Sequence, residues 1–183
     1  MAGSILCFGE VLMRLSAPGH EVLLQRPQLD VQIGGAEANV AVALSAFGHS
    51  VAMSGVLPDN PLGRAARDAL RRYGVDMRAM AFTQGRMGLY FHTCGAGHRA
   101  SEVLYDRAES AFALATPEQY QWPSLLAGKQ LLHLSGITPA LGAQSAQAAL
   151  DAARAARAAG AWVSFDGNYR ARLWAAWDGN PRL

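Results

Sequence analysis

The sequence predicts an α/β fold with a mostly parallel central sheet and a second, smaller sheet. Short apolar runs that are typical of buried strands alternate with helical stretches along the chain. Near the C-terminal end, a strand, an alanine-rich helix and another strand follow one another at the spacing of a right-handed βαβ unit. The strands should therefore be parallel, with ligands bound at their carboxyl ends. Two extended segments joined by a glycine-containing turn predict a hairpin.

The composition is that of an ordered, globular protein. Of 183 residues, 51% are hydrophobic and 16% are charged, which allows a substantial core in one domain. The formal net charge is only +2 and the basic residues are scattered, so we expect no nucleic-acid partner. No apolar run reaches the roughly 18 residues that a membrane helix needs, so we expect no membrane partner either.

The cysteines and histidines indicate a reducing compartment and no metal centre. Cys7 and Cys94 lie far apart, show no Cys-x-x-Cys spacing and follow no secretory leader, which predicts a cytoplasmic protein. The five histidines do not fall at ligand spacing with one another or with cysteine. We therefore predict no metal site from these side chains.

The first strand is predicted over the apolar run from Ser4 to Phe8, followed by a more exposed extended piece from Val11 to Ser16. No Gly-x-Gly-x-x-Gly follows the first strand, which argues against a dinucleotide-binding fold. Glu10 stands where this strand ends. A carboxylate at that position can bind a polyol, or it can be an ion-paired acid, and both alternatives stay open.

The stretch from Gln32 to Gly48 is the most informative one. Gly34 and Gly35 permit positive φ and let a ligand approach the backbone. The helix that follows is almost entirely apolar, so we expect it to be buried on all sides. Asn39 lies one turn into it, able to bond a hydroxyl close to the positive end of the helix dipole. The alternative is a tight turn before a core helix, with Asn39 bonded to nearby backbone.

The next segments continue the alternation of strands and helices. Residues 21–33 predict a strand of the small sheet, and residues 51–57 a buried strand. A helix should run from Pro61 to about residue 73, because Asp59 and Asn60 precede it as cap residues and Pro61 suits the first helical position. Gly74 is a typical C-terminal stop.

The predicted hairpin joins residues 87–93 to residues 101–107. Tyr90 lies on its first strand, and Tyr105 and Arg107 share one face of the second because side chains alternate along a strand. Tyrosines on a half-exposed sheet commonly just pack against neighbours, which is the alternative here. A guanidinium, however, can grip a carboxylate through two bonds, so Arg107 favours an acidic ligand over a neutral one.

The C-terminal part predicts a strand over residues 130–136, a helix over 142–159 and a strand over 161–165. Residues 166–170, Asp-Gly-Asn-Tyr-Arg, then follow a buried strand and predict a turn and a helix start, with Asp166 as an optional cap.

Three motifs resemble the ribokinase-like (PfkB) carbohydrate kinases, most closely the 2-keto-3-deoxygluconate kinase branch. They are the string Gly-Gly-Ala-Glu-Ala-Asn from Gly34, the pair formed by Tyr90 and Tyr105-Asp106-Arg107, and the Asp-x-Asn-x-Arg of residues 166–170. Gly167 departs from the proline or leucine frequent in that branch. The resemblance implies a ribokinase-like three-layer sandwich with an incomplete central sheet, and a β-sheet lid with strands from about 11–33 and 86–108.

The same resemblance implies roles for individual residues. It places Arg170 at the transferred phosphoryl group, where it stabilises charge, and Asn168 near the nucleotide phosphates or their magnesium ion. The residues that it implies for substrate binding are Glu10, Gly34, Gly35, Asn39, Tyr90, Tyr105, Arg107 and Arg170.

The implied activity is ATP- and Mg²⁺-dependent phosphorylation of a sugar acid, 2-keto-3-deoxygluconate, to its 6-phosphate. The alternatives are another PfkB sugar kinase, such as a fructokinase, and a non-catalytic sugar-binding remnant. Exposed lid strands also invite pairing between copies, so we expect a homo-oligomer through the lid sheet.

Residues 1–183 match only the N-terminal part of one ribokinase-like domain. The family's Gly-Ala-Gly-Asp stretch, which supplies the general base and the anion hole, does not occur in the sequence, and neither does the Asn-x-x-Glu that organises magnesium. The resemblance therefore places the general-base aspartate and the ATP-binding C-terminal part beyond Leu183. We expect a truncated polypeptide, a gene fragment or a degraded gene, and a chain that is inactive as a kinase on its own.

Overall fold

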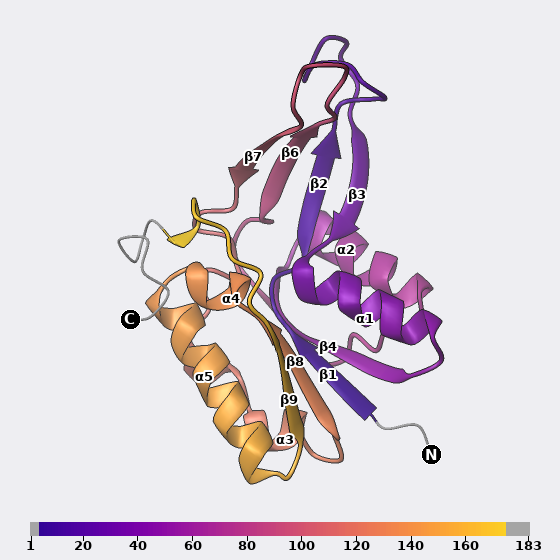
Figure 1. Cartoon of the computed structure of the whole chain (residues 1–183). Coiled ribbons are helices and arrows are strands. Elements are labelled where there is room, and N and C mark those ends of the chain that lie inside the picture. Colours follow the sequence, from indigo (N-terminus) through magenta and orange to yellow (C-terminus); the bar gives the residue numbers. More distant parts are fainter. Residues whose placement is uncertain (1–3, 175–183) are drawn as a thin grey trace.

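The computed structural model of the chain describes residues 4–174 and contains two separate sheets. A five-stranded sheet forms the body with helices on both of its faces, and a four-stranded sheet rises from one end of it (Figure 1). This arrangement confirms the predicted α/β fold with a central sheet and a smaller second sheet.

All strands of the main sheet are parallel. It contains β1 (Ser4–Phe8), β4 (Ser50–Pro58), β5 (Met80–Thr83), β8 (Leu131–Ser135) and β9 (Trp162–Asp166). The spatial order is β5-β4-β1-β8-β9, which places the first strand in the middle. Because the strands are parallel, the segments that leave their carboxyl ends meet along one edge.

Helices cover the two faces of this sheet. On one side lie α1 (Ala36–Ala46) and α2 (Pro61–Arg72), and on the other α3 (Trp122–Leu125), α4 (Ile137–Ala140) and α5 (Ala143–Ala158). A 3₁₀ turn, η1 (Pro117–Gln119), precedes α3. The predicted start of α2 is confirmed, since the Asn60 side chain accepts hydrogen bonds from the backbone of Leu62 and Gly63. The short helix α4 was not predicted.

Two hydrophobic clusters fill the space between the sheet and its helices. Side chains along β1 alternate between the two faces of the sheet. Leu6 and Phe8 therefore pack in the cluster beneath α5, whereas Ile5 and Cys7 pack in the cluster beneath α1 and α2. Phe8 is fully buried, and its ring meets those of Tyr120 and Trp122 edge-on at 4.9 Å. Edge-to-face pairs of this kind add to the burial of their area.

The second sheet, called the lid below, has mixed strand directions. It contains β2 (Leu12–Ser16), β3 (Asp30–Gly34), β6 (Leu89–Thr93) and β7 (Glu102–Asp106), in the order β3-β2-β6-β7. The central pair β2 and β6 is parallel, and the two outer pairs are antiparallel. The predicted hairpin corresponds to β6 and β7, in which Tyr90 lies directly opposite Tyr105.

The prediction that the helix after the glycine pair is buried on all sides was wrong. Within α1 only Glu37, Ala38 and Ala41 are buried, and Phe47 just after its end is 79% exposed. One side of α1 packs on β1, β4 and β8, and no element within residues 4–174 covers its opposite side. The helix α1 therefore contains more apolar residues than its contacts in the described structure bury.

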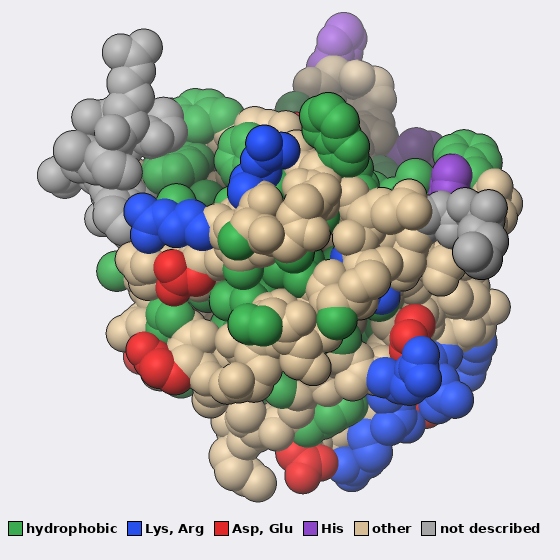
Figure 2. Space-filling model, turned by 90° about the horizontal axis from the view of Figure 1, so that it is seen from below, with side chains coloured by type: hydrophobic (Ala, Val, Ile, Leu, Met, Phe, Trp, Pro, Cys, Tyr) green, Lys and Arg blue, Asp and Glu red, His purple; other side chains and the backbone are tan. Residues whose placement is uncertain are grey.

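Several charged side chains on the surface form ion pairs. Figure 2 shows basic side chains beside acidic ones at one margin and exposed hydrophobic side chains elsewhere. The ion pairs include Arg64 with Asp59 at 2.9 Å and Arg78 with Asp76 at 2.7 Å. Pairing with Arg78 lowers the pKa of Asp76 to about 2. No helix among residues 4–174 is long and apolar enough to cross a membrane.

Glu37 is the buried acid that joins α1 to the end of β8. Its Oε1 accepts hydrogen bonds from the Ser135 backbone N–H at 3.1 Å, the Ser135 hydroxyl at 2.7 Å and the Thr138 hydroxyl at 3.1 Å. Burial raises the pKa of the Glu37 carboxyl, and these bonds offset part of the rise. Burial and, to a lesser extent, the nearby Glu37 raise the pKa of Cys7 to about 12, so that thiol stays protonated at neutral pH.

The raised pKa of Glu37 predicts how stability changes with pH. The unfolded carboxyl ionises near pH 4.5, whereas the native one ionises at a higher pH. In the window between these two values the unfolded state releases a proton that the native state keeps, so the free energy of unfolding falls as pH rises. Glu37→Gln has no such proton. Urea unfolding from about pH 4.5 to about pH 8 should show the wild type losing stability relative to this variant, and a constant difference across that range would contradict the assignment.

Candidate functional site

A pocket of about 360 Å³ opens where the carboxyl edge of the main sheet faces the lid. Most of the residues singled out from the sequence line it together, although they come from segments far apart along the chain. Its lining consists of Glu10, Leu12, Gly35, Ala36, Asn39, Tyr90, Val103, Tyr105, Arg107, Ile137, Asn168 and Arg170. Gly34 is the one predicted site residue that is not part of this lining.

The N-terminal end of α1 forms the floor of the pocket. Gly35 has φ of +152°, and a side chain there would collide with the backbone carbonyl of Glu10. Only glycine therefore allows this close approach. Gly34 lies behind Asn39, since a Cβ on Gly34 would be 3.1 Å from the Asn39 Oδ1. The Asn39 side chain itself is exposed and bonds to no other described residue, so its amide is free for a ligand.

A buried ion pair joins the main sheet to the lid at the side of the pocket. Glu10, at the end of β1, is 3% exposed, and Arg107, just after β7, is 6% exposed. Nε of Arg107 donates to Oε2 of Glu10 at 2.9 Å, and Nη2 donates to the same oxygen. The hydroxyl of Ser110 donates to Oε1. A side chain at Gly88 would collide with this carboxylate, so the pair also requires glycine there.

This pairing changes the interpretation of both residues. Of the two alternatives for Glu10, the ion-paired acid is present, and Glu10 still borders the pocket. Arg107 was expected to grip an acidic ligand through two bonds, but its Nε and Nη2 are already engaged. Of the three guanidinium nitrogens of Arg107, Nη1 is the one without a hydrogen-bond partner among the described residues. This arginine can therefore offer a ligand one nitrogen donor and little net charge.

Two tyrosines form an aromatic wall on the lid side. Tyr90 and Tyr105 face each other across β6 and β7, with ring centroids 6.0 Å apart and planes tilted by 41°. The guanidinium carbon of Arg107 lies 6.0 Å from the Tyr105 ring centroid. The wall thus offers two hydroxyls and flat apolar surface to a carbon chain, with a cation close behind it.

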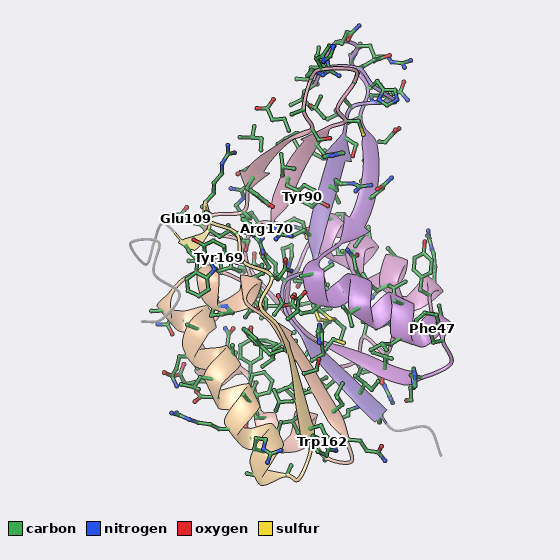
Figure 3. All side chains as sticks on the ribbon, in the orientation of Figure 1. Phe47, Tyr90, Glu109, Trp162, Tyr169 and Arg170 are labelled. Carbon is green, nitrogen blue, oxygen red and sulfur yellow. The ribbon has the colours of Figure 1, made fainter. Side chains whose placement is uncertain are left out.

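The opposite wall follows β9. Asp166 accepts a hydrogen bond from the backbone N–H of Asn168 at 3.0 Å, so residues 166–168 form a turn. The Arg170 side chain is exposed, and its Nη1 donates to the Tyr169 carbonyl at 3.1 Å. Figure 3 shows Arg170 at the junction of body and lid, below Tyr90. Arg170 is therefore the cation of this pocket that has no acidic partner among residues 4–174.

The charges of the pocket follow from these contacts. Its charged lining residues are Glu10, Arg107 and Arg170, of which the first two neutralise each other. One positive charge remains, and it faces the opening. Among the described residues there is no group of three or more histidine, cysteine or acidic side chains that could hold a metal ion. The described part of the pocket thus suits an anionic ligand.

The general base is not among the residues that the structure describes. The aspartate that the resemblance places beyond Leu183 lies outside residues 4–174, so this expectation stays a prediction. Within the described part of the chain, the pocket provides polar groups and one cation without an acidic partner, Arg170.

Sequence reasoning missed Ser110, which completes the environment of Glu10, and the role of Glu37 in joining α1 to β8. A charged residue inside an apolar helix was a signal for Glu37, because such a residue needs buried partners. Nothing in the local sequence marked Ser110, whose partner lies 100 positions away.

Comparisons with known proteins place this chain in a family. Residues 2–179 match the model of the pfkB family carbohydrate kinases. A 2-dehydro-3-deoxygalactonokinase from Haloferax volcanii is 36% identical over 178 residues, which is 97% of this chain and 56% of that protein.

Solved structures agree with this match. The 2-dehydro-3-deoxygluconokinase from Thermotoga maritima has a TM-score of 0.91 and 44% identity, covering 94% of this chain and 53% of that one. A fructokinase from Xylella fastidiosa with bound ATP has a TM-score of 0.82 and 29% identity, covering 98% and 58%. The chain spans about half the length of these relatives. It belongs to the PfkB family of carbohydrate kinases.

Proposed function

We propose that this chain carries the sugar-binding part of an ATP-dependent kinase that phosphorylates 2-keto-3-deoxygluconate on its 6-hydroxyl. The observation that carries the proposal is the single uncompensated positive charge of the pocket, on Arg170, opposite the wall of Tyr90 and Tyr105. A 2-keto-3-deoxy sugar acid brings one carboxylate, which balances that charge. A neutral hexose leaves it unbalanced.

The remaining groups of the pocket suit the rest of such a ligand. The Asn39 amide and the two tyrosine hydroxyls can exchange hydrogen bonds with sugar hydroxyls, and Nη1 of Arg107 adds one more donor. Leu12, Val103 and Ile137 provide apolar contact for the carbon chain. Among the solved structures, the higher identity to the 2-dehydro-3-deoxygluconokinase, 44%, than to the fructokinase, 29%, supports the same substrate class.

In the proposed reaction, the 6-hydroxyl attacks the γ-phosphoryl group of ATP and loses its proton to a base. Asn168 lies toward the nucleotide phosphates, and the charge that develops on the transferred group is stabilised by groups on the nucleotide side, because Arg170 is engaged by the carboxylate at the other end of the carbon chain. Glu10 is the one carboxylate in the described lining of the pocket, and both of its oxygens already accept hydrogen bonds, from Arg107 and Ser110, so neither is free to take the proton. The base and the groups that hold Mg²⁺-ATP must therefore be supplied by residues outside those described, and we propose an aspartate beyond Leu183 as the base.

Two further properties accompany the proposal. We propose a homo-oligomer through the lid, because Val31 and Leu104 are exposed on the face that alternates with the Tyr90 side. We also propose a cytoplasmic location, in keeping with ATP as co-substrate and two free cysteines. The alternatives remain a fructokinase-type substrate and a sugar-binding protein without catalysis.

The charge argument predicts the effect of Arg170→Gln on substrate choice. The affinity for 2-keto-3-deoxygluconate should fall at least about tenfold, equivalent to about 1.4 kcal/mol, while that for fructose changes less than about twofold. Titration calorimetry with both sugars measures this difference. The matched control is Arg172→Gln, an exposed arginine that does not line the pocket. Equal losses for both sugars, or an equal loss in the control, would contradict the assignment of Arg170.

The buried ion pair predicts a different outcome at Arg107. Arg107→Ala should cost about 3–5 kcal/mol of folding free energy, because Glu10 is left buried without its ion-pair partner. The double variant Glu10→Gln, Arg107→Ala removes that unpaired charge and should recover much of the stability. Urea unfolding of the three proteins tests this, and a single variant as stable as the wild type speaks against the pair.

The described pocket has no carboxylate other than Glu10, which is ion-paired, so we predict that the 183-residue chain alone does not catalyse phosphoryl transfer. Incubation with ATP, Mg²⁺ and 2-keto-3-deoxygluconate should yield no sugar phosphate above the uncatalysed level, whereas the Thermotoga maritima kinase, assayed in parallel, should yield it. Product formation that scales with the concentration of the pure chain would show that a base exists among these residues.

A further inference from the structure

Glu37 does not line the pocket, yet it touches the segments that form its walls. It lies in the first turn of α1, between Gly35 and Asn39, which line the floor. On its other side, a Cβ on Gly9 would collide with the Glu37 carboxyl group, so the backbone that leads into Glu10 packs directly on it. Glu37 therefore contacts the end of β1 as well as the floor.

The third contact of Glu37 leads to the wall that carries Arg170. The Ser135 hydroxyl donates to Oε1 of Glu37 and accepts a bond from the backbone N–H of Ile137, a lining residue, at 3.2 Å. The backbone N–H of the neighbouring Gly136 donates to the Asp166 carbonyl at 2.8 Å, which connects this turn to the end of β9.

The turn after β8 also packs on the segment after β9. A side chain on Gly136 would collide with the carbonyl of Gly167, the residue before Asn168. The turn that Glu37 holds is thus itself in contact with the segment carrying Asn168 and Arg170. A displacement of this turn is transmitted to that segment through packing and a backbone hydrogen bond.

We propose that Glu37 is a positioning residue that fixes the distance between the α1 floor and the Arg170 wall, and so sets the affinity for the sugar acid. The inference rests on the proposed function, because it takes 2-keto-3-deoxygluconate as the ligand. Glu37 acts through Ser135 and Thr138 and makes no contact with the ligand itself.

A carboxyl group is suited to this task because one of its oxygens receives all three bonds from the turn after β8. Removing it leaves three buried donors without a partner and opens a space between the two walls. Glutamine keeps the accepting oxygen and the shape of the side chain. The two substitutions therefore separate loss of the contact from loss of charge.

The test compares Glu37→Ala and Glu37→Gln with the wild type in two measurements on the 183-residue chain. Titration calorimetry with 2-keto-3-deoxygluconate should show an affinity at least about tenfold weaker for the alanine variant and within about threefold of wild type for the glutamine variant. Hydrogen–deuterium exchange without ligand should show faster exchange over residues 135–138 and 166–170 in the alanine variant only.

Leu70→Ala is the matched control, because Leu70 is buried in α2 and lines neither wall. It should lower the melting temperature and leave affinity and exchange over 135–138 and 166–170 unchanged. Should the alanine variant at 37 fail to fold, Thr138→Val removes one donor at constant shape, and an affinity about threefold weaker supports the proposal.

The outcomes separate the two proposals. A wild-type chain that does not bind the sugar acid refutes the proposed function, while the exchange measurement still decides whether Glu37 holds the two walls. The positioning role is overturned if Glu37→Ala binds the sugar acid as tightly as the wild type, or if its exchange over 135–138 and 166–170 is unchanged. An equal loss of affinity in Leu70→Ala also overturns it. Where the alanine variant does not fold, unchanged affinity in Thr138→Val overturns it.

Discussion

The parallel register of the main sheet is the constraint on which the candidate site depends. Three neighbouring strands, β1, β8 and β9, end at the same edge, and each delivers one segment to the pocket. The helix α1 adds a fourth segment, because it packs across the same sheet. Residues far apart along the chain thereby meet within one small volume, where the buried Glu37 of α1 accepts hydrogen bonds from Ser135 and Thr138.

The lid depends on a second interaction, the buried pair of Glu10 and Arg107. Taking two charges out of water is costly, and the gain from their attraction recovers that cost only when the geometry is good and the remaining lone pairs are satisfied. Ser110 satisfies one of them. The pair therefore contributes less to overall stability than to fixing where β7 meets the end of β1, which is the position from which Tyr105 lines the pocket.

Local sequence patterns were sufficient to predict most strands and helices, whereas the resemblance to the PfkB kinases singled out most of the residues that gather at the pocket. Asn60, Pro61 and Gly74 bound α2 as their chemistry requires. Partners far apart in sequence could not be predicted, because no local pattern shows that Glu10 neutralises Arg107. The environment of α1 was misjudged for a related reason: apolar composition reports how much surface a helix should bury, but not which elements are there to bury it.

Three glycines at the foot of the lid carry a consequence for how this site can evolve. At Gly9, Gly35 and Gly88 the position of a Cβ is already occupied by an oxygen or carbon of Glu37 or Glu10. Even alanine, one methyl group larger, would push a buried acid or the adjacent backbone out of place. Substitutions that alter ligand preference are thus excluded at these three glycines, while the lid strands, Asn39 and the segment after β9 are not restricted in this way.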